Sequence, residues 1–98
     1  MPEQFATPHQ LVIVDDDDAG RRMLRRALER KGYSIAEASD GEAGLELIRA
    51  TLPAAALLDL RMPGRFSGFD VIRQLHADAA TADIPLIARK PWPQPPSS

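Results

Sequence analysis

The 98-residue chain contains no cysteine, which excludes a disulfide framework and any zinc site with cysteine ligands. Aromatic residues make up only 5% of the sequence, and no apolar run approaches the ~20 residues that a membrane-spanning helix needs. The formal net charge of −2 provides no broad field that would attract nucleic acid or an anionic membrane. We therefore expect a cytoplasmic protein with neither nucleic acid nor a membrane as a partner.

The distribution of proline indicates one domain between two irregular ends. Residues 1–10 are polar, include Pro2 and Pro8, and do not have the pattern of a signal peptide, so we expect a flexible leader. The segment 91–98 contains four of the nine prolines, which favours an unpacked, proline-rich tail over residues 89–98. The intervening residues 11–88 are enough for one domain.

Short apolar runs alternate with segments of helical periodicity. In chain order, the pattern predicts strands over 11–14, 33–38, 54–58 and 84–88, and helices over 17–31, 42–51 and 69–77. This alternation is typical of an α/β domain with parallel strands and right-handed crossovers. In such sheets, ligands bind beyond the carboxyl ends of the strands.

Helical spacing also predicts which side chains face the sheet. The residues expected to face inward are Met23, Leu24, Ala27 and Leu28 in the first helix, Ala43, Leu47 and Ile48 in the second, and Phe69, Ile72 and Leu75 in the third. Asp17 or Asp18 is suited to cap the start of the first helix, and Gly32 is suited to end it.

Acidic residues follow two of the predicted strands. Asp15 and Asp16 close the first strand, and Asp59 closes the third. If these strands are neighbours, three carboxylates converge, and such a cluster either raises the pKa of one carboxyl group or binds a cation. A donor set made only of oxygen atoms suits Mg²⁺ better than zinc or copper. A carboxylate beside Mg²⁺ can attack a phosphoryl group and form an acyl phosphate.

The acidic run has two other interpretations. Acids at a helix start interact favourably with its dipole, and this explains Asp17 and Asp18 without any ligand. An EF-hand loop beginning at Asp15 fails, because Ala19 stands at its fifth position and Arg26 where the bidentate glutamate belongs. The second carboxylate position, at the end of another buried strand, favours a cation site.

Three segments, in order, resemble the receiver domains of bacterial response regulators. They are LVIVDDDD at 11–18, LLDLRMPG at 57–64 and IPLIA at 84–88. The resemblance implies a flavodoxin-like parallel sheet of order 2-1-3-4, with Asp59 as the phosphoacceptor. It also implies that Asp15, Asp16, Asp59 and the backbone carbonyl of Arg61 bind Mg²⁺. A histidine kinase or a phosphotransfer protein would supply the phosphoryl group, and the domain would promote only its own phosphorylation and dephosphorylation.

The resemblance stops near Ala88, before the fifth strand and last two helices of a typical receiver. Counted without a gap, Lys90 falls on the family's Thr/Ser position; aligned by motif, Lys90 and Pro91 match its lysine–proline pair. Both alignments stay open, and so does a third reading in which Lys90 is a solvated lysine without a role. In the functional reading, Lys90 is a candidate contact for the phosphoryl group. A phosphatase is disfavoured, because Arg61 stands where its second aspartate belongs.

The missing elements would leave the fourth strand and first helix exposed. We therefore expect self-association through them. The alternative function is a truncated receiver that acts as a non-signalling interaction or dimerisation module. The arginines of the first helix form a basic stripe, interpreted either as a solvated face or as a docking surface for the kinase partner.

Overall fold

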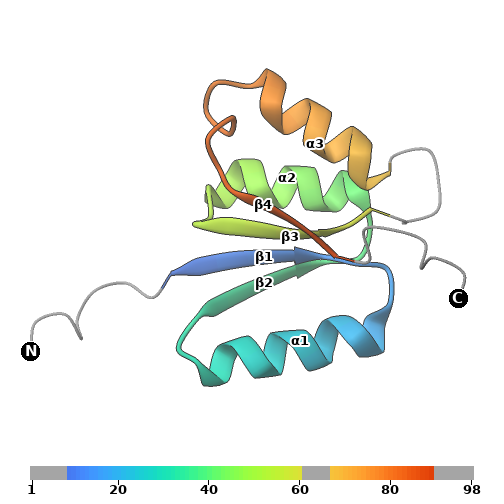
Figure 1. Ribbon diagram of the computed structural model, residues 1–98, viewed down its shortest axis with the longest axis vertical. Helices are drawn as coiled ribbons and strands as arrows, with labels where there is room; N and C mark the ends of the chain where they lie inside the picture. Colours follow the sequence, from blue (N-terminus) through green and yellow to red (C-terminus); the bar gives the residue numbers. More distant parts are fainter. Residues whose placement is uncertain (1–8, 61–66, 90–98) are drawn as a thin grey trace, which may run out of the picture.

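A computed structural model describes residues 9–60 and 67–89 of the chain. The elements are β1 (Gln10–Val14), α1 (Asp18–Arg30), β2 (Ser34–Ala38), α2 (Gly41–Thr51), β3 (Ala55–Asp59), α3 (Gly68–Ala77) and β4 (Leu86–Arg89). All paired strands are parallel, in the order β2-β1-β3-β4 (Figure 1). The predicted fold class and strand order are confirmed for this part of the chain. Most of the expected leader and proline-rich tail lies outside it.

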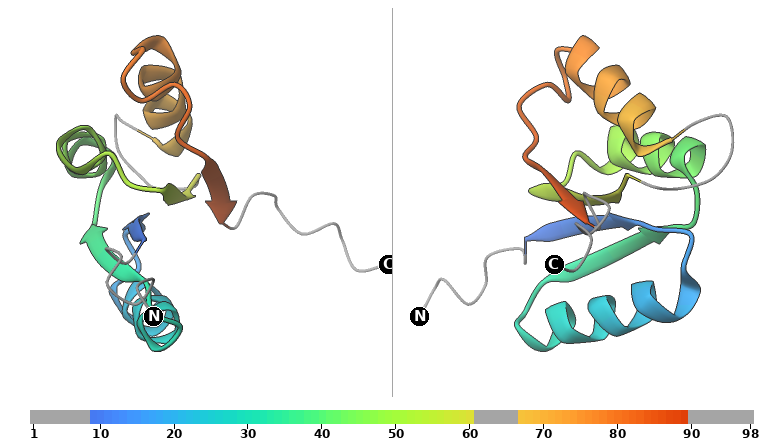
Figure 2. Two further views of the ribbon diagram at one scale, coloured as in Figure 1. Left: turned by 90° about the vertical axis from the view of Figure 1, so that its left-hand side faces the viewer. Right: turned by 45° about the vertical axis from the view of Figure 1, so that its right-hand side comes forward.

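The sheet has helices on both faces, with α2 and α3 on one side and α1 on the other (Figure 2). Strand alternation directs one set of apolar side chains toward α2 and α3, where they form the main core. Its buried members are Val12, Val14, Ala38, Leu45, Ile48, Ala56, Leu58, Val71 and Leu75. This core packs the central strands β1 and β3 against α2 and α3. The packing helps to fix the ends of these two strands relative to each other.

The face of the sheet near α1 is less completely covered. Ile13 is fully buried, but Ala55 and Leu57 of β3 are half-buried and Ile87 of β4 is 50% exposed. Helix α1 has no buried residue, and Met23 is 72% exposed. The expectation that Met23 and Ala27 face inward is therefore wrong. The reason is that α1 packs against β2 and β1 and does not extend over β3 and β4.

Gly44 in α2 and Gly68 in α3 lie where these helices come closest to the sheet. The buried residues of these helices are Gly41, Gly44, Leu45 and Ile48 in α2, and Gly68, Val71 and Leu75 in α3. The expected inward positions of Ala43 and Phe69 are wrong, because both side chains are exposed. At Gly44 a Cβ atom would come within 2.6 Å of Val14, so the helix approaches the sheet on its glycine side and turns Ala43 away.

The helix ends use different capping interactions. Asp40 caps α2, with its carboxylate accepting a hydrogen bond from the Ala43 amide at 2.8 Å. Asp17 occupies the N-cap position of α1, but its side chain makes no capping hydrogen bond. Gly32, with φ of 97°, follows the end of α1 as predicted. None of the helices in the described ranges is long and apolar enough to cross a bilayer.

Candidate metal centre

The register of the two central strands brings three aspartates to one edge of the sheet. Val14 of β1 pairs with Leu58 of β3, so the residues that follow each of them meet at the same carboxyl edge. Carboxylate oxygens of Asp15, Asp16 and Asp59 all lie within 4.8 Å of one another. The convergence expected from the strand ends is therefore present.

The three carboxylates differ in exposure. Asp15 and Asp59 are 0% and 1% exposed, whereas Asp16 is exposed. Like charges this close repel, and burial makes the repulsion and the loss of hydration more costly. A bound divalent cation offsets both costs. The all-oxygen donor set and the open side at Asp16, where water can complete the coordination, fit Mg²⁺.

Asp15 is held through its main chain as well as its side chain. Its amide donates to the carbonyl of Ala38 at 3.1 Å, which links the end of β1 to the end of β2. Its carboxylate Oδ1 accepts from the Asp17 amide at 2.9 Å, in a local turn of the Asx type. Its own carbonyl accepts from Arg21 Nη1 at 2.7 Å. The loop that follows β1 is thus fixed at several points.

Arg21 also joins this loop to β2. Its Nε donates to Glu37 at 2.8 Å and its Nη2 pairs with Asp18 at 2.7 Å. Burial lowers the pKa of the Arg21 guanidinium, but the hydrogen bonds to Glu37 and Asp18 outweigh this effect and raise the pKa above its ordinary value. The hydrogen bond from Arg21 lowers the pKa of Glu37, helped by Arg25 and opposed by burial.

Helix α3 begins directly against the main chain of Asp59. A Cβ atom on Gly68 would lie 2.6 Å from the Asp59 carbonyl oxygen and 2.8 Å from Leu60 Cα. Ser67 and Asp70 close a capping box that fixes the first turn of this helix. The start of α3 therefore supports the end of β3 where Asp59 lies.

Two residues of the predicted site cannot be placed. Arg61, whose carbonyl was expected to bind the metal, and Lys90, the candidate phosphoryl contact, both lie outside the described residues. Conversely, the sequence did not indicate Arg21, Glu37 or Gly68 as parts of the site. The only signals were that Arg21 follows the acidic pair within the first turns of α1 and that Gly68 begins the helix that follows β3.

Comparison with known proteins identifies the class. Residues 11–90 match the response regulator receiver domain family, and the chain belongs to this family. It is 42% identical over 80 residues to the response regulator MprA of Mycolicibacterium vanbaalenii, covering 82% of this chain and 33% of the relative. It is 41% identical over 78 residues to MprA of Mycobacterium avium, covering 80% of this chain and 33% of the relative. The chain thus spans about a third of the length of these curated relatives.

Solved structures show the same fold. The N-terminal domain of a response regulator receiver protein from Methanoculleus marisnigri superimposes with a TM-score of 0.81 at 32% identity, covering 92% of this chain and 72% of the other. The receiver domain of the sensor histidine kinase PA1611 from Pseudomonas aeruginosa, whose structure has a magnesium ion coordinated in its active-site cleft, superimposes with a TM-score of 0.78 at 22% identity. That alignment covers 84% of this chain and 66% of the other.

Proposed function

We propose that this receiver domain is a phosphorylation switch in a two-component or phosphorelay system, with Asp59 as its phosphoacceptor. The observation that carries the proposal is the meeting of three carboxylates within 4.8 Å at the ends of neighbouring strands, in a chain of the receiver family. The donor is a phosphohistidine on a histidine kinase or a phosphotransfer protein. We also propose that the protein acts in the cytoplasm.

The proposed reaction is a transfer between two side chains. A carboxylate oxygen of Asp59 attacks phosphorus while the phosphorus–nitrogen bond of phosphohistidine breaks, and the imidazole leaves with the electron pair. Asp15, Asp16 and Asp59 would hold Mg²⁺, which supplies charge compensation for the phosphoryl oxygens. In this proposal, burial of Asp59 limits access of water, and the close approach of Gly68 to its main chain restricts how the residue can move.

Two further roles belong to the same proposal. The Arg61 carbonyl would complete the protein ligands of the metal, and Lys90 would contact the phosphoryl group. In this proposal the domain promotes only its own phosphorylation and dephosphorylation. Water later attacks the acyl phosphate and returns the free Asp59 carboxylate and inorganic phosphate.

Mass spectrometry of the intact protein tests this function. The protein is incubated with acetyl phosphate and Mg²⁺, and we expect a single phosphate adduct that excess EDTA prevents. Asp59→Asn should abolish the adduct, whereas Asp83→Asn, at an exposed aspartate outside the cluster, should retain it. An adduct that survives in Asp59→Asn, or no adduct on the wild-type protein, would contradict the proposal.

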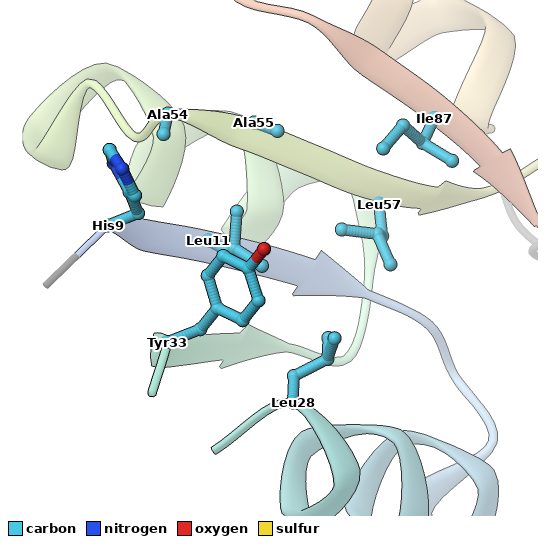
Figure 3. Close-up of a pocket in the computed structure, with 8 residues that line it drawn as sticks. All are labelled: His9, Leu11, Leu28, Tyr33, Ala54, Ala55, Leu57 and Ile87. Carbon is cyan, nitrogen blue, oxygen red and sulfur yellow. The ribbon is translucent and has the colours of Figure 1, made fainter. Parts of the chain in front are cut away.

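A second candidate function, an interaction or dimerisation module, is favoured by an apolar hollow on the α1 side of the sheet. The hollow has a volume of about 430 Å³ and is lined by His9, Leu11, Leu28, Tyr33, Ala54, Ala55, Leu57 and Ile87. Figure 3 shows Leu28 of α1 and Leu57 of β3 pointing toward the same space. We propose that a second copy of the chain covers this hollow and the outer edge of β4.

A further inference from the structure

Arg21 has three hydrogen-bonding partners from three separate places in the chain. They are the main-chain carbonyl of Asp15 beyond β1, the carboxylate of Asp18 in the first turn of α1, and the carboxylate of Glu37 in β2. The Arg21 side chain is only 11% exposed. A guanidinium is suited to this arrangement because its planar fork directs several N–H groups at fixed angles.

The contact with Asp15 acts on the main chain of a candidate metal ligand. Arg21 fixes the carbonyl of Asp15, while the carbonyl of Ala38 fixes its amide. These two bonds fix the main chain from which the Asp15 side chain projects, and the Asp17 amide holds its Oδ1 at 2.9 Å, so the carboxylate has few directions available. We infer that Arg21 is a positioning residue, which sets the direction of the Asp15 carboxylate toward the bound cation; this inference rests on the proposed function.

Charge and geometry at Arg21 have opposite effects on cation affinity. A positive side chain next to the site repels Mg²⁺, so charge alone predicts that its removal strengthens binding. Glu37 and Asp18 are hydrogen-bonded to the guanidinium and offset its charge, as the raised pKa of Arg21 and the lowered pKa of Glu37 reflect. Positioning predicts the reverse result, namely that loss of Arg21 weakens binding although a positive charge has been removed.

Arg25 provides a matched control. It lies one helical turn further along α1 and also donates to Glu37, but its other partner is Glu29, and none of its hydrogen bonds in the described structure reaches Asp15. Arg25→Gln therefore removes the same charge and a bond to the same glutamate, and leaves the Asp15 carbonyl held by Arg21.

Isothermal titration with Mg²⁺ alone tests the inference, at a temperature where circular dichroism shows each variant folded. We expect Arg21→Gln to weaken Mg²⁺ binding about tenfold, as loss of a group that orients a metal ligand commonly does. Arg21→Lys should also weaken binding, because one ammonium group cannot make the three hydrogen bonds of the guanidinium. This variant keeps the positive charge, so it serves as the test if Arg21→Gln does not fold. Arg25→Gln should bind Mg²⁺ like the wild type.

The outcomes separate this inference from the proposed function. Unchanged or tighter Mg²⁺ binding by folded Arg21→Gln and Arg21→Lys overturns the positioning role and leaves the phosphoacceptor proposal intact. Equal weakening in Arg25→Gln also overturns it, because the effect is then one of general stability. A wild-type protein that neither binds Mg²⁺ nor takes a phosphate adduct overturns both.

Discussion

Asp15 and Asp59 bring two carboxylates into the interior of a small domain, at 0% and 1% exposure. Burial of charge is unfavourable unless partners offset it, so such residues are rarely retained for stability alone. They converge with an exposed third carboxylate, Asp16, in a cluster whose composition suits a cation and which is open on one side. The proposed chemistry depends on these residues, so the groups that hold them in place are the positions to test.

Gly68, at the start of α3, lies close against the main chain of Asp59. A Cβ atom there would collide with main-chain atoms of Asp59 and Leu60, which cannot rotate away as a side chain would. We expect Gly68→Ala to destabilise the domain by about 1–3 kcal/mol and to weaken Mg²⁺ binding, measured by urea unfolding and by titration.

Gly32→Ala is the matched control for this substitution. Its φ of 97° makes alanine unfavourable by about 1–2 kcal/mol, but a Cβ atom at position 32 meets nothing within 4 Å, and the residue lies at the far end of α1. The variant should lose stability and keep its Mg²⁺ affinity. Normal Mg²⁺ affinity in Gly68→Ala would show that α3 does not fix Asp59.

Glu37 gives the stability of the domain a specific pH dependence. Its pKa is lowered from an ordinary 4.5, so the folded state is favoured above that pH and loses this contribution as the pH falls through the folded-state pKa. We expect Glu37→Gln to be less stable than the wild type at pH 6, with the difference shrinking below about pH 4.5. Urea unfolding across this range checks it, and a difference that grows toward acid would contradict the assignment.

The sequence predicts those residues of the site whose positions follow from where single strands end. Asp15, Asp16 and Asp59 follow apolar runs, and the ends of parallel strands share an edge, so their convergence could be predicted. Arg21 could not be found in this way, because its partner Glu37 is 16 residues away and the contact depends on how α1 lies across β2. Hydrophobic periodicity contains no information about such a crossing.

At the scale of secondary-structure elements, strands were predicted more accurately than helix faces. A continuous apolar run predicts a buried strand without any need to assign which side faces inward. Each predicted strand overlaps an observed one. Helix faces depend on where the closest approach falls, and at Gly44 and Gly68 that approach is made by a residue without a side chain. A pattern of apolar residues does not detect such a contact, so it wrongly predicts inward positions for Ala43 and Phe69.

The start of α3 depends on its capping box. The Asp70 carboxylate accepts from the Ser67 amide at 2.8 Å, and Ser67 Oγ accepts from the Asp70 amide at 3.4 Å. We expect Ser67→Ala to lower the free energy of unfolding by about 1 kcal/mol, measured by urea denaturation. Ser39→Ala, at an exposed serine just before α2, should have little effect. Equal losses in the two variants would argue against a capping role.

The whole molecule has one well-covered face and one partly open face. Helices α2 and α3 bury the first, while α1 leaves the β3 and β4 side of the second accessible, where Ile87 and Leu57 line the apolar hollow. This asymmetry could not be read from the sequence, because periodicity predicts which side of a strand is apolar and not how far a helix extends over it.

Self-association should follow from this open face. We expect sedimentation velocity at micromolar concentration to show a dimer that Ile87→Glu dissociates. Phe69→Glu is the control, because Phe69 is 57% exposed on α3, on the opposite side of the sheet. A compact wild-type monomer, or dissociation by Phe69→Glu with none by Ile87→Glu, would contradict the proposed interface.

The cation site itself is tested most directly by nuclear magnetic resonance with Mn²⁺, a paramagnetic ion that binds the same oxygen ligands as Mg²⁺. Substoichiometric Mn²⁺ should broaden the amide signals of residues 14–17 and 58–60 most strongly, and excess Mg²⁺ should restore them. Sharp signals from both strand ends, with broadening centred on other acids such as Asp40 or Asp83, would contradict a shared metal centre at the ends of β1 and β3.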